Sequence, residues 1–356
     1  MKSIFNHQIL TRIKKRGGGI LSKKRKRLLI GSFLVISLFL SVAFGSREVF
    51  AANPMEISIF TTQFGSIGYN HGIAAAEVLK KFNPKLSAKS IETLGMSDAI
   101  KQIQDPPHQT NALAYNGTSN RFPNKQGMPP LKKPAELQTL FVTMETGYTV
   151  MTADPKIKTL YDLQGKRMNV GTPAAFFAFA KYCEALDLKF SRTVRIGHAQ
   201  GKDAIVDGTL DAAIATLWRV GTKWAPSPAA QELFSQKNGR LVSVPKEAME
   251  KVRKIYPEAW YGEAPPGAFG AWQTEPLGFF FQLNGFFVHP KFPEDLAYEI
   301  VKTIAGHGNE MKGYHASLGA MVDPAFLASL SPELDFADYH PGAVRYYTEI
   351  GVWKRK

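Results

Sequence analysis

The chain has 356 residues, with 44 Lys and Arg against 30 Asp and Glu, one cysteine and a formal net charge of +14 at pH 7. A chain of this length is expected to form more than one domain. The single cysteine, Cys183, excludes an internal disulfide and a cysteine-rich metal site. Because it lies within a helical pattern, we expect a buried structural residue and not a catalytic thiol.

The positive charge is concentrated at the start of the chain. Residues 1–51 hold eleven basic residues and one acidic residue, which leaves 33 basic and 29 acidic residues, a net charge of +4, in the remainder. That balance is ordinary for a soluble domain and gives no reason to expect nucleic-acid binding.

An apolar run over 28–44 follows the basic stretch, and small residues follow it at Ala51 and Ala52. This order predicts a signal peptide over 1–51, cleaved after Ala51, and therefore a periplasmic or otherwise extracytoplasmic protein. An uncleaved anchor helix is the alternative, because the run is nearly long enough to span a bilayer.

From residue 56 onward, strand and helix patterns alternate. We expect strands at 56–61, 87–93 and 111–115, with helices at 71–82 and 98–104. Each strand ends in a loop of Gly, Ser, Thr or Asn residues. This arrangement is typical of an α/β unit with polar loops at the carboxyl ends of its strands.

The same alternation restarts after residue 145. The pattern predicts strands at 147–153, 194–196 and 212–219, and helices at 174–186 and 201–207. We therefore expect the first part of one lobe over residues 52–145 and a second lobe over 146–244.

The last third of the chain is expected to return to the first lobe. Residues 245–276 are rich in Pro, Gly and aromatic residues and predict a crossover connection. Residues 277–356 begin with an apolar strand at 277–288 and a helix at 293–306, and are mostly helical thereafter. A chain that leaves one lobe and returns to it crosses twice, which predicts a hinge and a cleft between the lobes.

Four stretches resemble one family, the TAXI-type receptors of tripartite, ion-driven (TRAP) transporters. They lie at 159–172, 207–213, 284–298 and 340–351, and the last, which begins His340-Pro341-Gly342-Ala343, is the most specific. The resemblance covers nearly all of the chain after residue 51. It implies a two-lobed α/β fold of the periplasmic-binding-protein type II superfamily, a small-molecule ligand, and integral-membrane transporter subunits as partners.

The glycine loop before the first helix is less dense than in that family, and Met96 replaces a small residue in the loop 93–97. These departures lie where we expect the ligand, so they bear on the substrate more than on the fold.

We expect ligand contacts where strands end and helices begin, since helix N-termini offer unpaired N–H groups and a partial positive charge. Each such opening is also typical of an ordinary capped glycine turn. Tyr69 and Trp218 are predicted to close over the ligand and Arg219 to pair with an acid, the alternative for each being simple packing or a surface role. The predicted ligand-binding residues are Tyr69, Asn70, Thr93, Gly95, Ser97, Asn116, Thr118, Gly171, Thr172, Trp218 and Arg219.

No catalytic set or metal-ligand spacing is found, so we expect neither an enzyme nor a cofactor. The resemblance implies the solute-binding subunit of a TRAP-type transporter, and we expect it to capture an organic acid or amino acid in an interlobe cleft. The alternatives are a receptor for an ATP-driven importer and, if the leader is uncleaved, a membrane-tethered sensor. The sequence does not name the ligand or the oligomeric state.

Overall fold

The computed structural model describes residues 53–64, 66–120, 124–128, 131–220, 223–257, 259–328 and 339–353. The predicted signal segment and its cleavage site therefore lie outside the described residues. Residues 54–356 belong to one compact unit. Within the described residues, no helix combines the length and the apolar character that crossing a membrane requires.

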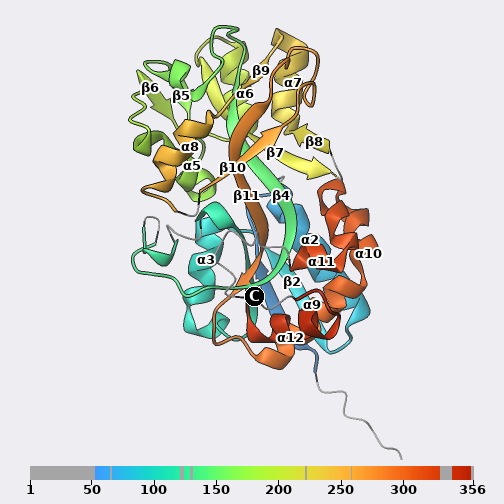
Figure 1. Cartoon of the computed structure of the whole chain (residues 1–356). Helices are drawn as coiled ribbons and strands as arrows, with labels where there is room; N and C mark the ends of the chain where they lie inside the picture. Colours follow the sequence, from blue (N-terminus) through green and yellow to red (C-terminus); the bar gives the residue numbers. More distant parts are fainter. Residues whose placement is uncertain are drawn as a thin grey trace, which may run out of the picture. The chain divides into compact units, whose positions relative to one another are not determined.

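One mixed sheet of eleven strands runs through the described part of this unit (Figure 1). Its hydrogen-bonded order is β2-β1-β3-β11-β4-β7-β5-β6, with β10 on β11, β8 on β7 and β9 on β4. The strands are β1 (Met55–Phe60), β2 (Leu86–Ile91), β3 (Ala112–Gly117), β4 (Gln138–Thr152), β5 (Arg167–Asn169), β6 (Arg192–Val194), β7 (Ala212–Val220), β8 (Lys223–Pro226), β9 (Arg240–Val242), β10 (Trp260–Ala264) and β11 (Leu277–Val288).

Helices follow most of the parallel strands, and several more close the chain. The α-helices are α2 (Ile67–Phe82), α3 (Met96–Gln104), α5 (Pro173–Ala185), α6 (His198–Val206), α7 (Pro228–Lys237), α8 (Lys246–Arg253), α9 (Glu294–Gly306), α10 (Gly308–Tyr314), α11 (Pro324–Leu327) and α12 (Pro341–Glu349). Short 3-10 helices are η1 (Pro106–His108), η2 (Thr118–Asn120), η3 (Leu160–Leu163) and η4 (Ala316–Val322).

Two long antiparallel strands, β4 and β11, join the two halves of the sheet (Figure 1). Toward one end, β11 pairs with β3, and the sheet extends from β3 to β1 and then to β2. Toward the other end, β4 pairs with β7 and β9. We call the β1–β3 half, with α2, α3, α9, α10 and α12, the first lobe, and the β5–β7 half, with α5 to α8, the second lobe. The predicted two-lobed α/β fold class is confirmed.

Some predicted elements differ in extent from the observed ones. The first predicted lobe boundary, after residue 145, falls inside β4, which runs without a break from Gln138 to Thr152. The stretch 245–276 that was predicted to connect the lobes contains α8 and β10, and β10 pairs with β11. The exact lobe limits therefore stay a prediction.

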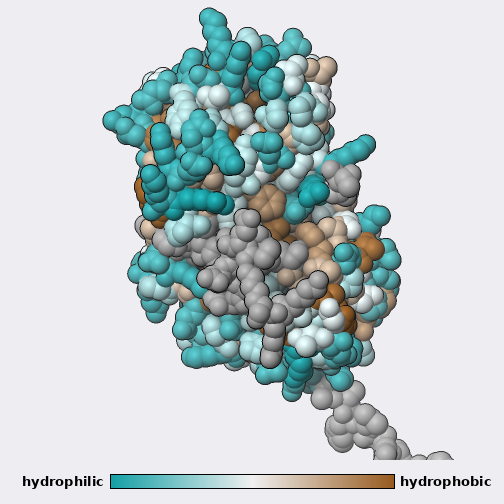
Figure 2. Space-filling view, in the orientation of Figure 1, coloured by the Kyte–Doolittle hydropathy of each residue, from teal (hydrophilic) through white to brown (hydrophobic). Residues whose placement is uncertain are grey.

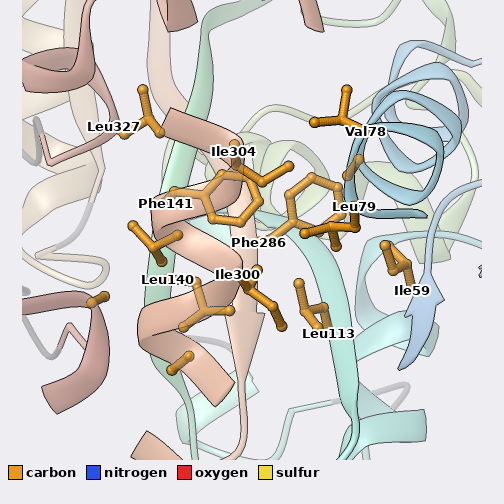
Figure 3. Packing of buried hydrophobic residues seen from close by; sticks show 14 of the residues in the cluster. Ile59, Val78, Leu79, Leu113, Leu140, Phe141, Phe286, Ile300, Ile304 and Leu327 are labelled. Atoms are coloured by element: carbon orange, nitrogen blue, oxygen red, sulfur yellow. The ribbon is translucent and has the colours of Figure 1, made fainter. Parts of the chain in front are cut away.

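The first lobe has its own hydrophobic core, formed by side chains of β1, β3, β4 and β11 against α2 and α9 (Figure 3). Ile300 and Ile304, one turn apart on α9, are fully buried and pack beside Phe141 and Phe286. Burying one such side chain contributes roughly 1.5–3 kcal/mol. In the second lobe, separate clusters lie under α5 and α8 and under α6 and α7, so helices cover both faces of that half.

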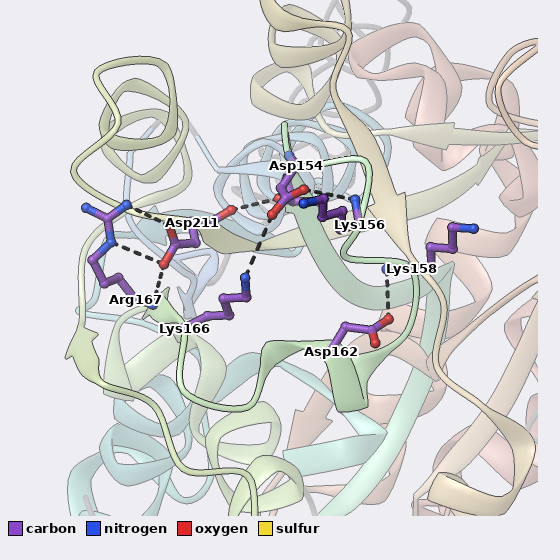
Figure 4. Close-up of polar contacts among 8 residues, drawn as sticks. Asp154, Lys156, Lys158, Asp162, Lys166, Arg167 and Asp211 are labelled. Atoms are coloured by element: carbon purple, nitrogen blue, oxygen red, sulfur yellow. Dashed lines mark hydrogen bonds and ion pairs between the residues drawn. The ribbon is translucent and has the colours of Figure 1, made fainter.

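Two of the family-like stretches meet in the second lobe (Figure 4). Arg167 pairs with Asp211 at 2.6 Å between Nη2 and Oδ1, and its Nη1 donates to the Gly208 carbonyl at 2.8 Å. Asp162 accepts the backbone N–H groups of Thr159 and Lys158 at the start of η3. These motifs therefore fix β5 against β7.

Candidate functional site

A buried polar network lies where β4 and β11 pass between the lobes. Its centre is the amide of Gln282, which is fully buried on β11. Gln282 Oε1 accepts from the Ser119 hydroxyl, and Nε2 donates to the Tyr148 hydroxyl and to Asn284 Oδ1, the last at 2.7 Å. Asn284 Nδ2 in turn donates to the Tyr115 hydroxyl at 3.1 Å. We call these five residues the central network.

The absence of a side chain at Gly117 leaves space for the Gln282 side chain. Gly117 pairs with Asn284 across the β3–β11 ladder, and a Cβ at this position would clash with the Gln282 amide. A glycine here therefore lets the side chain of one strand cross over the backbone of its neighbour.

A second arm continues the network toward the C-terminal helices. His71, fully buried on α2, lies 3.0 Å from Thr143 Oγ1 through Nδ1 and 2.7 Å from Ser317 Oγ through Nε2. Ser317 Oγ also lies 2.7 Å from Nδ1 of His315. We call His71, Thr143, Ser317 and His315 the histidine arm. It ties α2, β4 and η4 together in the first lobe.

The network is held uncharged by its burial. Burial, together with the charge that His315 would carry, lowers the pKa of His71 to about 3. Burial raises the pKa of Tyr115 and of Tyr148, and hydrogen bonds offset only part of each rise. Neutral groups that satisfy one another avoid the large cost of placing charge in this interior.

Strand register places further polar and aromatic groups beside Gln282. Gln282 pairs with Thr146, and Thr146 pairs with Trp218, so these three side chains share one face of the sheet. Thr146 Oγ1 is buried without a hydrogen-bond partner among the described residues. A buried hydroxyl without a partner is uncommon and indicates a place for a ligand or water atom.

The second lobe brings the start of α5 to this region. α5 packs against η2, which carries Ser119, and its Phe179 and Tyr182 rings contact Phe280, two residues from Gln282. Thr172 is the N-cap residue of α5, and its Oγ1 is buried and lacks a partner within the described part of the chain. Gly171 precedes it with a positive φ of 75°, and its N–H donates to Asn169.

The predicted residues of the first lobe fall into two groups. Asn116 and Thr118 flank Gly117 at the end of β3: the Thr118 hydroxyl accepts from the Leu283 N–H at 3.1 Å, and Asn116, which pairs with Gly285 and so projects away from the face of Tyr115 and Asn284, has its Nδ2 buried without a partner among the described residues. Thr93, Gly95 and Ser97 lie at the start of α3, where the Thr93 hydroxyl donates to the Thr61 carbonyl and accepts from the Gly95 N–H at 3.2 Å. Because α3 contacts α5, this loop also lies between the lobes.

Tyr69 and Asn70 lie in the first turn of α2 and are half-buried. The Tyr69 N–H donates to Ser66, and its ring packs edge-on against Phe64, which is 76% exposed. Their part in ligand binding stays a prediction.

Trp218 and Arg219 do not share a face. Successive strand residues project to opposite sides of a sheet, and Arg219 Nη1 pairs with Glu145 Oε2 at 3.0 Å on the side away from Gln282. Trp218 therefore lies on the face of the central network, whereas Arg219 is neutralised by a carboxylate on the other.

Sequence reasoning missed the centre of the network. Gln282 and Asn284 interrupt the otherwise apolar strand 277–288 at a spacing of two, a signal that both face the same side. His71 and Ser317 are 246 residues apart, and no local pattern links them. Among the described residues no group of His, Cys, Asp or Glu residues is arranged to hold a metal ion.

The surface between the lobes is partly apolar. In Figure 2, hydrophobic side chains gather in the middle of the view, between the two lobes, whereas hydrophilic ones cover most of the second lobe. Phe281, Trp224 and Trp260 form an aromatic group on the same face of the sheet as Arg219.

Comparison with known proteins places the chain in a family. Residues 59–351 match the NMT1-like family, and the chain belongs to it. Similar solved structures include MatC from Rhodopseudomonas palustris with bound malate, at 11% identity and a TM-score of 0.47 over 75% of this chain and 90% of that one. A TctC solute binding protein from Polaromonas matches at 15% identity and a TM-score of 0.46, over 85% of this chain and 100% of that one.

The periplasmic aliphatic sulphonate binding protein SsuA from Escherichia coli is similar at 15% identity, with a TM-score of 0.41 over 75% of this chain and 79% of that one. All three TM-scores lie below 0.5, so the description of the fold rests on the topology of the chain itself.

Proposed function

We propose that the protein is an extracytoplasmic solute-binding receptor that captures a small polar molecule between its lobes and delivers it to membrane transporter subunits. The observation that carries the proposal is a set of buried polar atoms on β3, on β4 and at the start of α5. Thr146 Oγ1, Thr172 Oγ1 and Asn116 Nδ2 come from both lobes and lack protein partners among the described residues. A few polar groups in a mostly apolar setting are typical of a small-molecule site.

The finer assignment is a TAXI-type receptor of a TRAP transporter, which binds an organic acid or amino acid. Its support is the resemblance of the stretches at 159–172 and 340–351, together with membership of the NMT1-like family. The unpaired amide of Asn116 and the start of α5 supply hydrogen-bond donors, which suit a carboxylate. Arg219 is paired with Glu145, and this ion pair makes it a weaker candidate for binding a ligand carboxylate than the unpaired amide of Asn116.

In this proposal no bond is made or broken, and the site needs no cofactor. A ligand that contacts Asn116 on β3 and Thr172 at the start of α5 would hold the lobes together, because β3 belongs to the first lobe and α5 to the second. The exported, extracytoplasmic location follows from the predicted signal segment 1–51.

Two alternative functions would use the same binding site. A receptor for an ATP-driven importer would use the same capture step with a different membrane partner. A membrane-tethered sensor would keep residues 1–51, and the mass of the exported protein distinguishes it from a cleaved receptor.

Thermal unfolding of the exported protein against carboxylates, amino acids and sugars tests the proposal. A ligand at about 100 times its dissociation constant stabilises the fold by about 2.7 kcal/mol. We expect a shift confined to one chemical class, and a loss of affinity of at least tenfold in Trp218→Ala. Trp224→Ala, a half-buried tryptophan on the opposite face, is the matched control and should keep its affinity.

A folded protein that carries no copurified ligand and responds to no compound in the panel would contradict solute capture. Turnover of a bound compound would instead indicate an enzyme on the same fold.

A further inference from the structure

The hydroxyl of Ser317 lies between two imidazole rings. Its Oγ is 2.7 Å from Nε2 of His71 and 2.7 Å from Nδ1 of His315. A hydroxyl carries one hydrogen, so it donates to only one of these rings at a time. The direction of this hydrogen bond therefore depends on the protonation of the histidines.

The backbone N–H of Ser317 also donates to Nδ1 of His315, at 3.2 Å. This nitrogen is thus an acceptor, and neutral His315 carries its hydrogen on Nε2. The Ser317 hydroxyl then donates to His315 Nδ1, His71 Nε2–H donates to Ser317 Oγ, and the Thr143 hydroxyl donates to His71 Nδ1. In all three of these hydrogen bonds, the donated hydrogen points along the arm toward His315.

A proton that binds His315 must bind Nδ1, the nitrogen that faces Ser317. Nδ1–H then donates to Ser317 Oγ, and the Ser317 hydroxyl turns to His71 Nε2. His71 moves its own hydrogen from Nε2 to Nδ1, with no net change in charge, and donates to Thr143 Oγ1. The Thr143 hydroxyl, which already lies 3.2 Å from the carbonyl of Asn284, then donates to that carbonyl and no longer to His71.

This reversal of hydrogen-bond direction therefore ends at a peptide group of β11. Asn284 belongs to the central network, and the ladder between β4 and β11 shifts its register between Asn284 and Gly285. A hydrogen bond gained at the Asn284 carbonyl acts at this irregular point of the strand, two residues from Gln282.

We propose that His315 is a proton-responsive positioning residue, which acts through Ser317, His71 and Thr143 on the Asn284 peptide group of β11. The inference rests on the proposed function in naming β11 as part of the binding site, and it adds pH-dependent tuning of that site.

Helices α2 and α9, which pack against α10, carry the charged residues Glu77, Lys80, Lys81, Glu294, Asp295, Glu299 and Lys302. The elements packed against η4 carry charged residues, which are Glu145 on β4, Arg219 on β7, Glu310 and Lys312 on α10, and Asp323 at the start of α11. Glu145 and Arg219 pair with each other, and Asp323 accepts from the Ala325 N–H. Burial alone lowers the pKa of His315, whereas the buried His71 feels burial and the charge of His315.

Nuclear magnetic resonance of the isotope-labelled, ligand-free protein tests the inference. The carbonyl ¹³C of Asn284 and the amide ¹⁵N of Gly285 report on a hydrogen bond to the peptide group that joins them. We expect both shifts to titrate as the pH falls below 6.5, because burial lowers the pKa of His315, and to share the midpoint of the His315 imidazole signals. The titration of this peptide group should be absent in His315→Gln and in Ser317→Ala.

His307→Gln is the matched control, since His307 is half-buried in the same helical region and bonds the Thr303 carbonyl outside the arm. It should leave the titration of the peptide group unchanged. Shifts of Asn284 and Gly285 that stay constant while His315 titrates, or that still titrate in folded His315→Gln, would overturn the inference. Because no ligand is present, neither result bears on solute capture.

Discussion

The protein contains two polar clusters of opposite character, the central network on β11 and a clamp between α9 and α12. The clamp consists of Arg345, which bonds Glu294 at 3.1 Å and Asp295 at 2.9 Å and stacks on Tyr298, and these side chains are largely exposed. The central network is buried and uncharged. Exposed ion pairs contribute little because water screens them, whereas a buried polar group that loses its partner is costly.

The comparison also distinguishes the stretches that resemble a known family from the residues of the candidate site. Arg345 of the clamp lies in the most specific of the family-like stretches, and other residues of that stretch hold α12 in place: His340 accepts from the Gly342 N–H at the start of the helix, and the Tyr347 hydroxyl donates to the Leu140 carbonyl of β4. The central network draws its residues from β3, η2, β4 and β11, and only Asn284 among them belongs to a family-like stretch. A motif that is easy to recognise can thus have a structural role, while most residues of the network lie outside such motifs.

Removing the centre of the network should have the largest effect. In Gln282→Leu, three buried groups on Ser119, Tyr148 and Asn284 lose their partner, and we expect a loss of about 3 kcal/mol in the free energy of unfolding. If the proposed site is correct, affinity for the ligand found in the panel should also fall by at least about tenfold. Urea unfolding and calorimetric titration measure the two quantities.

Gln273→Leu is the matched control. Gln273 is a buried amide that bonds the carbonyls of Pro265 and Glu275 and accepts from the Phe269 N–H. Its loss should destabilise the fold by a similar amount and leave ligand affinity intact. Equal losses of affinity in both variants would show that the central network acts only through stability.

Acidification should have the next largest effect, and it should separate the histidine arm from the clamp. The folded pKa of His71 is about 3, lowered by burial and by His315, against 6.5 for the unfolded chain. Its contribution to stability is therefore complete above pH 6.5 and is lost as the pH falls toward 3. At pH 5 the loss is about 2 kcal/mol.

Urea unfolding at pH 7.5 and pH 5 measures this loss, and His71→Gln should remove it. An unchanged pH dependence in that variant would locate the acid sensitivity in other histidines.

Breaking the clamp should have the smallest effect. Arg345→Ala removes two exposed ion pairs and the contact with Tyr298, and we expect less than about 1 kcal/mol of destabilisation. The loss should shrink further in 1 M salt, where screening is strong. A loss above about 2 kcal/mol in thermal or urea unfolding would mean that the packing of α12, and not the charge of Arg345, dominates.

Much of the fold was readable from sequence because its signals are local. The apolar strand predicted at 277–288 and the strand observed at Leu277–Val288 agree to the residue, since Pro276 and Pro290 flank a largely hydrophobic run. The helix expected at 71–82 begins earlier, at Ile67, because the Ser66 hydroxyl caps its first turn. β4 was expected to begin at 147 but begins at Gln138, since only its pairing with β11 extends it.

The candidate site was only partly predictable. Polar loops at strand ends indicated Asn116, Thr118 and Thr172, which lie between the lobes or beside the central network. Alternation along a strand could have shown that Trp218 and Arg219 project to opposite faces. The pairing of Arg219 with Glu145, which is 74 residues distant in the chain, could not have been read locally.

The sequence by itself determined the alternation of strands and helices, the α/β class and the chain's return to its first lobe, because these follow from hydrophobic periodicity within short segments. Tertiary structure alone decided that His71, Thr143, Asn284 and Ser317 meet in one buried hydrogen-bonded network. The reason is physical: periodicity fixes which face of a segment is buried, but which distant polar group satisfies a buried one depends on how the segments pack.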